Sequence, residues 1–220
     1  IYCVLTLTEV LCLKLAGMPL YDSFIHAFSS AGTGGFSNRN ASVGAYGSVA
    51  IDLIITVFIL LFSLNFAVYF LLLTRKWREA LSSDELRFFL LVVTGATILI
   101  AIDIAPLYTS IWESLRYSVF QVASIISTTG FATADFVLWP HFSQTILVLL
   151  MFCGACAGST GGGIKCSRVL ILLRSIRREI HRVIHPRSVE VVKLDGKVVE
   201  EDTLRSISVF VGSYLFIILA

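Results

Sequence analysis

Long apolar runs alternate with short polar or charged segments along the whole chain. A helix of about 20 apolar residues can cross a bilayer. Five runs approach that length or share its composition: residues 1–18, 48–73, 88–108, 141–153 and 166–173. A further apolar run starts near Thr203. The pattern predicts an all-α integral membrane protein with several spans.

Two stretches between these runs, 18–40 and 112–136, are amphipathic and too polar to cross. The segment 74–87 is basic, and a second basic group follows the fifth run: Arg168, Arg174, Arg177, Arg178, Arg182 and Arg187. Basic segments collect on the cytoplasmic side of a membrane. The two basic segments lie on the same, cytoplasmic side only if each amphipathic stretch enters the membrane from its outer face and returns to that face. We therefore expect the order span, re-entrant hairpin, span, repeated along the chain.

The two amphipathic stretches repeat each other. A shift of 95 residues places Ser29 on Ser124, Thr33 on Thr128, Gly35 on Gly130 and Phe36 on Phe131. We call residues 33–36 ("TGGF") the first TxGF segment and residues 128–131 ("TTGF") the second. A repeat in the same direction favours pore-forming units. An alternating-access cation carrier, whose repeats are often inverted, is the alternative.

Each TxGF segment follows a short amphipathic helix, an arrangement that suits a cation path. Glycine reaches backbone angles that turn carbonyl oxygens toward an axis, and such carbonyls can replace the hydration shell of K⁺. One copy would fit a tight turn between packed helices equally well, whereas two copies in register favour a pore. A closed ring takes about four such hairpins, so we expect this chain to be part of a longer protein.

The segment "GACAGSTGGGIK" (residues 154–165), here called the glycine loop, interrupts the last two apolar runs. It departs from the phosphate-binding G-x-x-x-x-G-K-[ST] pattern, because Ile164 separates Gly163 from Lys165. Two interpretations stay open: a kink of small residues, or a movable break in a pore-lining helix. Lys165 either extends to water at the cytoplasmic face, tunes the charge of the cavity, or holds the loop closed.

Composition narrows the class of protein. Of 220 residues, 56% are hydrophobic and 15% charged, which excludes an ordinary soluble domain. The net charge of +2 gives no reason to expect nucleic acid as a partner. The four histidines lack metal or triad spacing, and the five cysteines, including Cys153 and Cys156, fit small buried residues. We expect neither an enzyme nor a bound organic cofactor.

Three motifs resemble the Trk/Ktr/HKT potassium-uptake superfamily, and within it the TrkH-type membrane subunit. They are "SSAGTGGFS" (29–37), "ISTTGFATADF" (126–136) and "GACAGSTGGGIKCSRVLILLR" (154–174). Members of that family have four helix–pore loop–helix units in one polypeptide, and the resemblance matches this chain to the second and third. It implies potassium uptake through a selectivity filter that an intramembrane loop gates.

The resemblance also implies roles for particular residues. The filter residues are Thr33, Gly34, Gly35, Phe36, Thr128, Thr129, Gly130 and Phe131. The backbone oxygens expected to bind K⁺ are those of Thr33, Gly34, Gly35, Thr128, Thr129 and Gly130. The gating-loop residues are Gly154, Gly158, Ser159, Thr160, Gly161, Gly162, Gly163 and Lys165. No residue here matches the pore-facing arginine of the family's fourth unit.

The expected organisation has five parts: a truncated second-type unit (1–73), a cytoplasmic loop (74–87), a third-type unit (88–175), a cytoplasmic linker (176–202) and the first helix of the next unit (203–220). Within the linker, Asp195-Gly196 between valine-rich flanks predicts a small β-hairpin.

The expected location is the cell membrane, crossed several times, with the pore loops facing outside. The resemblance implies a homodimer surrounded by the lipid bilayer. It also implies a TrkA-like cytoplasmic nucleotide-binding subunit that contacts residues 168–200.

Three acidic residues fall inside apolar runs, namely Glu9, Asp52 and Asp103. Such charges are functional candidates, because burying them in lipid is costly. Asp52 is near the outer end of its run, where we expect a solvated flank. Glu9 and Lys14 are poorly spaced for a helical pair, and the sequence names no partner for Asp103.

Overall fold

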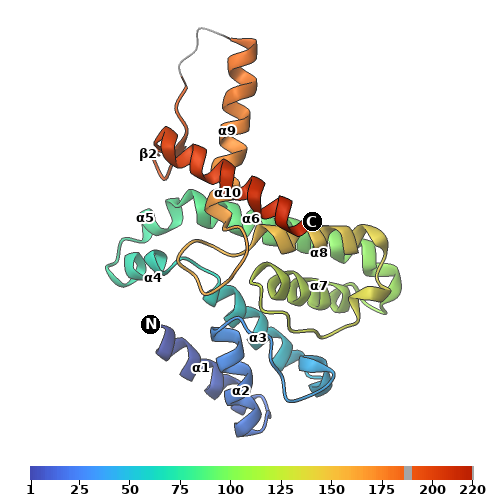
Figure 1. The fold of residues 1–220 in the computed structure, drawn as a ribbon. Helices are drawn as coiled ribbons and strands as arrows, with labels where there is room; N and C mark the ends of the chain where they lie inside the picture. The colour runs from blue at the N-terminus through green and yellow to red at the C-terminus, as the bar shows by residue number, and fades with distance from the viewer. Residues whose placement is uncertain (186–189, 220) are drawn as a thin grey trace.

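The computed structural model describes residues 1–185 and 190–219 and is mostly helical (Figure 1). Its helices are α1 (Tyr2–Leu15), α2 (Leu20–Ala31), α3 (Val49–Phe62), α4 (Phe66–Leu73), α5 (Trp77–Ser82), α6 (Asp84–Ile104), α7 (Ile111–Ile126), α8 (His141–Cys153), α9 (Cys166–Ile184) and α10 (Glu201–Leu219). Two short strands, β1 (Lys193–Leu194) and β2 (Lys197–Val198), pair antiparallel. The predicted helical class and the small hairpin are confirmed.

Local sequence accounts for several boundaries. Ser110 and Asn65 cap α7 and α4, because their side-chain oxygens accept a hydrogen bond from a backbone N–H of the first turn. In the hairpin, Asp195 and Gly196 have φ of 49° and 76°. Two consecutive left-handed residues form the turn that matches the twist of paired strands.

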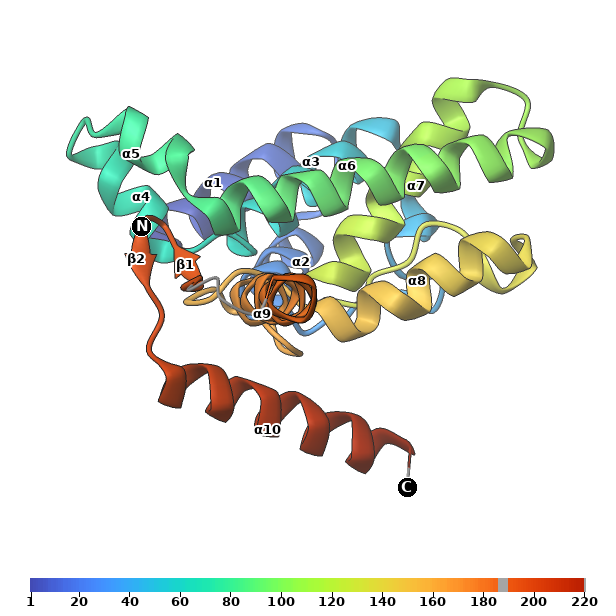
Figure 2. The same cartoon turned by 90° about the horizontal axis from the view of Figure 1, so that it is seen from above.

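Two helix pairs form the body, α1 with α2 and α6 with α7, and α3 packs against α1, α2 and α7 (Figures 1 and 2). One buried apolar cluster joins α6, α7 and α8 and includes Phe89, Ile104 and Leu147. A second joins α3 to α7 and includes Ile55 and Phe120. The two repeats are therefore held together by apolar packing across the α3–α7 interface.

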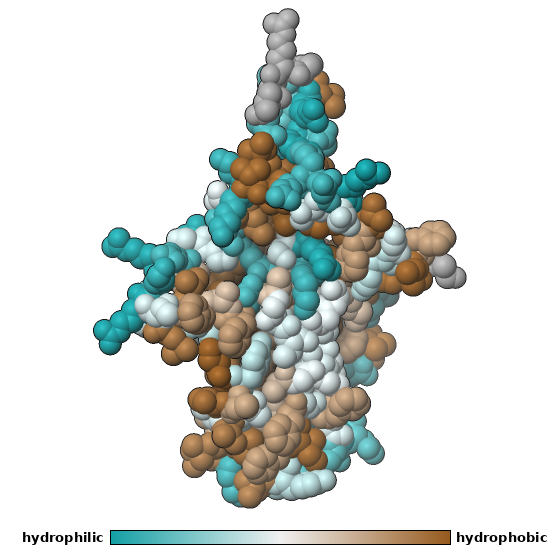
Figure 3. Space-filling model, turned by 60° about the vertical axis from the view of Figure 1, so that its left-hand side comes forward, coloured by the Kyte–Doolittle hydropathy of each residue, from teal (hydrophilic) through white to brown (hydrophobic). Residues whose placement is uncertain are grey.

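The outside of the body is apolar. In Figure 3 hydrophobic side chains lie along both sides of the lower part of the molecule, with side chains of intermediate hydropathy between them, and hydrophilic side chains are most frequent toward its upper end. On α1 the exposed residues Val4, Leu7, Leu11 and Leu15 recur every three or four positions, so they share one helix face. An apolar stripe that faces outward is typical of contact with lipid.

The segment 48–73 is not one straight span. Among the described residues, Asp84–Leu107 is long and apolar enough to cross a membrane by itself, whereas α3 and α4 pass the same test only together and are bent by 91°. The run 48–73 therefore keeps the length and composition of a span, but it is divided into two helices and is not one continuous helix. Asn65 causes the break, since its side chain caps a new helix. A shift of 95 residues carries Asn65 onto Thr160, so the glycine loop interrupts the second repeat at the equivalent place.

The two predicted cytoplasmic segments are more helical than the sequence indicated. The segment 74–87 contains α5 and the first turn of α6, and α9 continues to Ile184, well into the predicted linker. The described residues do not include 186–189 or 220. Arg187 and a short part of the predicted partner contact (168–200) therefore lie outside them.

Candidate functional site

The two TxGF segments have the same backbone geometry. The helices before them end at Ala31 and Ile126, which are equivalent in the repeat. In both segments the threonine and the glycine two positions later have positive φ: 49° at Thr33, 67° at Gly35, 61° at Thr128 and 88° at Gly130. Threonine rarely adopts this left-handed conformation, so its occurrence at both equivalent positions reflects a specific local requirement.

One backbone hydrogen bond folds each TxGF segment back onto its helix. The Gly34 N–H donates to the Ser29 carbonyl oxygen at 2.8 Å, and the Thr129 N–H donates to the Ser124 carbonyl oxygen at 3.0 Å. These pairs are equivalent in the repeat. Both segments thus use the free carbonyl groups at a helix C-terminus to hold their position.

The two TxGF segments lie against each other at Gly35. A methyl group on Gly35 would lie 2.0 Å from the Thr129 carbonyl oxygen and 3.2 Å from the Gly130 carbonyl carbon. Only glycine allows this approach. Further along, the Gly44 N–H donates to the Ala132 carbonyl oxygen at 3.1 Å, so the connections that follow the segments are also joined.

The second TxGF segment is more enclosed than the first. Phe131 is fully buried, and its ring stacks on His26 with 5.5 Å between centres. The equivalent Phe36 is 77% exposed. Thr129 is buried, and its hydroxyl lies 2.7 Å from the Ser127 hydroxyl. The two TxGF segments therefore share the same backbone turn, whereas the burial of their side chains differs.

The glycine loop packs directly against both TxGF segments. The Thr33 hydroxyl donates to the Thr160 carbonyl oxygen at 3.2 Å, and the Gly162 N–H donates to the Thr128 hydroxyl at 2.7 Å. A methyl group on Gly161 would lie 2.9 Å from a backbone oxygen at the C-terminus of α7. The predicted filter and gating residues are thus brought together in one place.

Lys165 turns back onto the glycine loop. Its amine donates a hydrogen bond to the Gly161 carbonyl oxygen, and the residue is half-buried. Gly154, Gly158 and Gly163 have φ of 63°, 66° and 71°, a conformation that other residues adopt at a cost. Of the roles left open for Lys165, this contact favours holding the loop in position.

Glu85, which sequence reasoning missed, anchors the glycine loop. It is buried in the first turn of α6, and its Oε1 accepts hydrogen bonds from the N–H groups of Ala157 (2.6 Å) and Ser167 (3.2 Å). Its Oε2 accepts from the Asn65 amide at 3.1 Å. The sequence signal was weak, because an acidic residue at the start of a helix is typical of a solvated N-terminus.

Asp22 fixes the connection that follows the first TxGF segment. Its carboxylate accepts hydrogen bonds from the Asn38 amide (2.6 Å), the Tyr46 hydroxyl (2.6 Å) and the Arg39 guanidinium (3.2 Å). The Tyr46 hydroxyl, and after it Asn38 and Arg39, hold the pKa of Asp22 below its usual value although burial acts in the opposite direction.

The acidic residues within apolar runs have different surroundings. Asp103 accepts hydrogen bonds from the hydroxyl (2.5 Å) and N–H (3.2 Å) of Ser143, and so stabilises the first turn of α8. Asp52 is buried rather than solvated as predicted, and its Oδ2 lies 3.7 Å from Arg116 Nε. Glu9 is fully buried, and neither carboxyl oxygen has a hydrogen-bond partner among the described residues.

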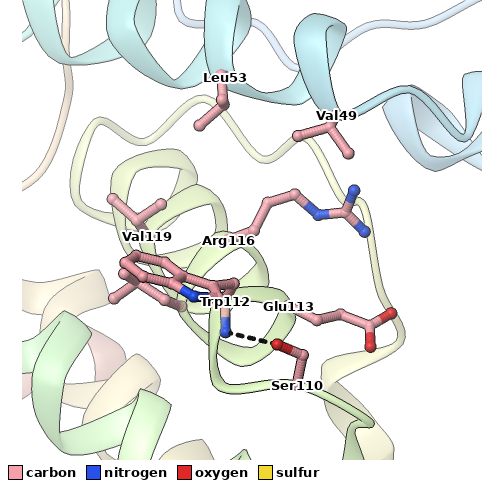
Figure 4. A pocket seen from close by; sticks show the side chains of 8 residues that line it. Val49, Leu53, Ser110, Trp112, Glu113, Arg116 and Val119 are labelled. Atoms are coloured by element: carbon pink, nitrogen blue, oxygen red, sulfur yellow. Dashed lines mark hydrogen bonds between the residues drawn. The ribbon is translucent and has the colours of Figure 1, made fainter.

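A pocket of about 560 Å³ lies away from this junction, between α3 and α7 (Figure 4). Val49 and Leu53 of α3 face Trp112, Arg116 and Val119 of α7 across it. None of the predicted filter or glycine-loop residues lines it. It is a feature of the α3–α7 packing and not a part of the candidate site.

The oxygen atoms at the junction are of the kind that an alkali cation binds. They are backbone carbonyl and threonine hydroxyl oxygens, the ligands of potassium-selective filters. Within residues 1–185 and 190–219, no group of three His, Cys, Asp or Glu side chains is arranged to hold a metal ion.

A helical body with exposed apolar faces, in which irregular backbone segments pack against one another, is an arrangement typical of membrane transport proteins. Residues 1–220 match the family model "TrkH: Cation transport protein" along their full length. The chain belongs to the TrkH family.

Relatives and a solved structure agree with this assignment. The Trk system potassium uptake protein TrkH of Halomonas elongata is 36% identical over 99% of this chain and 45% of its own length. The Trk system potassium uptake protein TrkG of Escherichia coli K12 is 35% identical over 97% of this chain and 44% of its own length. The crystal structure of the potassium transporter TrkH from Vibrio parahaemolyticus aligns with a TM-score of 0.92 at 32% identity.

The alignment with the solved structure covers 99% of this chain and 48% of the solved chain. The chain therefore spans about half the length of the relatives that it matches. Those relatives are named as transport proteins and not as enzymes.

Proposed function

We propose that this chain contributes two selectivity-filter hairpins to a potassium-uptake protein. The observation that carries the proposal is the contact between two TxGF segments with the same left-handed residues. Positive φ at alternate residues turns successive carbonyl oxygens toward one side of a chain, where they can replace the water around K⁺. The oxygens concerned are those of Thr33, Gly34, Gly35, Thr128, Thr129 and Gly130.

The names of the relatives support potassium as the substrate, since both Trk proteins are uptake proteins for that ion. The direction of the repeat supports a pore. Its two units run in the same direction along the chain, whereas carriers with alternating access are often built from inverted units.

The glycine loop is the gate in this proposal. Its hydrogen bonds to Thr33 and Thr128 put it at the junction of the two TxGF segments, where it would obstruct an ion leaving the filter. A break made of glycines moves at low cost, because its backbone has few steric restrictions. Opening would require release of these bonds and of the Lys165 contact.

The basic end of the molecule is the proposed cytoplasmic side, with segments 74–87 and 176–202 there and the TxGF hairpins facing outside. Arg174 of α9 lies 2.8 Å from Asp84 and donates a hydrogen bond to the Lys193 carbonyl oxygen at 2.5 Å. A nucleotide-binding regulatory subunit docked on 168–200 could therefore act on the start of α6, next to Glu85. A homodimer is the proposed assembly.

The test is potassium uptake by the full-length protein in cells that lack their own uptake systems. Growth at low potassium and uptake of K⁺ in preference to Na⁺ are expected. Removal of residues 158–163 should raise basal flux in a folded, surface-expressed protein. Failure of the intact protein to take up K⁺ contradicts the proposed substrate, and unchanged or lower flux after the deletion contradicts the gate.

A further inference from the structure

Two cysteines stand at the two ends of the glycine loop. Cys153 is the last residue of α8, and Cys166 is the first residue of α9. They are 13 positions apart in the sequence, yet their sulfur atoms lie 3.8 Å apart. Both are free thiols. The pair therefore closes the base of the loop without a covalent bond.

The backbone around this pair is also drawn together. The Cys166 N–H donates to the Ala155 carbonyl oxygen at 3.0 Å, and the Cys166 thiol donates to the Gly154 carbonyl oxygen at 3.2 Å. A methyl group on Gly154 would lie 2.6 Å from the Gly162 carbonyl oxygen. The beginning and the end of the loop thus lie side by side at its base. In the same structure, the middle of the loop contacts the TxGF segments.

The two thiols differ in access. Cys153 is half-buried, and Cys166 is fully buried against the loop backbone. Of the two, Cys153 is therefore the residue that a small hydroperoxide able to enter an apolar surface reaches first, and Cys166 is positioned to react with the product. This division between an accessible thiol and an adjacent resolving thiol is typical of redox-sensitive pairs.

We propose that Cys153 and Cys166 form a redox-modification site, in which a hydroperoxide links them as a disulfide that locks the glycine loop against the TxGF segments. The effect on flux rests on the proposed gating role of the loop. The disulfide itself does not, because it depends only on the two sulfur positions.

The reaction is balanced by one hydroperoxide molecule. The Cys153 thiolate attacks one peroxide oxygen, the O–O bond breaks, and a sulfenic acid forms while the other oxygen leaves as water or an alcohol. The Cys166 sulfur then attacks the Cys153 sulfur, the S–O bond breaks and water leaves. Two thiols lose two electrons and two protons, and the peroxide is reduced by the same two electrons.

The geometry requires only a small movement. A disulfide needs about 2.05 Å between sulfurs, so side-chain rotation with slight adjustment of the loop base closes the remaining gap. A cross-link between Cys153 and Cys166 removes the conformations in which the two ends of the loop separate. Because the loop base is closed in the structure, the link should favour the obstructing position of the loop.

The experiment uses the full-length protein in vesicles, treated with hydrogen peroxide and then with dithiothreitol. Mass spectrometry should find a peptide linked through Cys153 and Cys166. Hydrogen–deuterium exchange within 154–165 should slow, K⁺ flux should fall by about tenfold or more, and dithiothreitol should reverse all three. Absence of the linked peptide overturns the proposal, as does a linked peptide with unchanged exchange and flux.

Variants keep the outcomes separate. Cys153→Ser and, independently, Cys166→Ser should conduct like the reduced protein and not respond to peroxide. Cys12→Ser, a change in α1, should keep the response and serves as the matched control. If the reduced protein carries no K⁺, the proposed function fails, while the linked peptide and the exchange of the loop still decide the proposal on the thiol pair.

Discussion

Glu85 Oε1 accepts a hydrogen bond at 2.6 Å from the N–H of Ala157, a residue 72 positions away. The same oxygen accepts from Ser167 at the start of α9, and the other oxygen accepts from Asn65 at the α3–α4 bend. One buried carboxylate therefore joins the interrupted helices of both repeats. Since such bonds are charge-assisted, they are among the stronger contacts that hold the glycine loop.

Glu85→Gln should loosen this anchor. The amide keeps the shape of the side chain but loses the negative charge and replaces one acceptor by a donor, which costs about 1.5 kcal/mol or more. If the anchor holds the loop closed, basal K⁺ flux should rise by about tenfold. Glu79→Gln, which changes an exposed residue paired with Lys76, is the matched control and should leave flux unchanged. Equal flux in both variants would reject the anchoring role.

Gly130→Ser should reduce selectivity without unfolding the protein. Nothing lies within 4 Å of a methyl group built on Gly130, so the side chain fits, but its φ of 88° strains any other residue. That strain is about 1–3 kcal/mol, and its relief would turn a carbonyl oxygen away from the ion path. The K⁺ over Na⁺ preference, measured as relative uptake, should fall by roughly tenfold.

Gly95→Ser is the control for that change. Gly95 lies within α6, has equal room for a side chain and does not have positive φ. Selectivity should remain that of the unmodified protein. A Gly130→Ser protein that is equally selective would contradict the filter assignment, whatever its total flux.

Ser143→Ala should destabilise the packing of α8 on α6. Ser143 is fully buried, and its hydroxyl is the closer of its two donors to Asp103. Without the hydroxyl, the Asp103 carboxylate loses one hydrogen-bond donor, which lowers the free energy of unfolding by about 1–3 kcal/mol. Thermal unfolding in detergent should show a lower Tm. Thr145→Ala removes only an exposed bond within α8 and should have a smaller effect; equal effects would mean that the contact with Asp103 is unimportant.

Asp22 should make stability sensitive to acid. Its pKa in the folded protein is lower than the unfolded value of about 3.9. The network with Tyr46, Asn38 and Arg39 therefore stabilises the protein fully above that pH, and its contribution is lost as the pH falls through the folded pKa. Asp22→Asn should lower Tm at neutral pH and reduce the further loss of Tm in acid.

Tm measured from neutral to acidic pH tests this expectation. Asp135→Asn, which removes an exposed carboxylate after the second TxGF segment, is the control and should follow the unmodified profile. An acid profile of Asp22→Asn identical to that of the unmodified protein would show that another group is responsible.

Features that depend on neighbours along the chain were predictable. The 95-residue repeat located both TxGF segments, and the Asp195-Gly196 pair located the hairpin turn, because turn geometry is a property of a few consecutive residues. The bend at Asn65 was missed, although an asparagine within an apolar run is a possible helix cap. Hydropathy averages over such a residue and therefore predicts one span.

Contacts between distant segments were not predictable in the same way. Nothing in the sequence around Glu85 indicates that it meets Ala157, and Asp52 was expected in water although it is buried near Arg116. Burial of a charge is decided by which helices pack together, and that packing cannot be read from the pattern of residues around the charge.

The sequence by itself determined that this is a helical membrane protein of the TrkH family, with two equivalent glycine turns and a glycine loop. Local backbone preference and apolar periodicity act over a few residues, so they can be read directly. Only the tertiary structure decided that the glycine loop touches both TxGF segments, that Glu85 holds it, and that Cys153 meets Cys166. These contacts arise from packing between residues far apart in the chain, which no local pattern encodes.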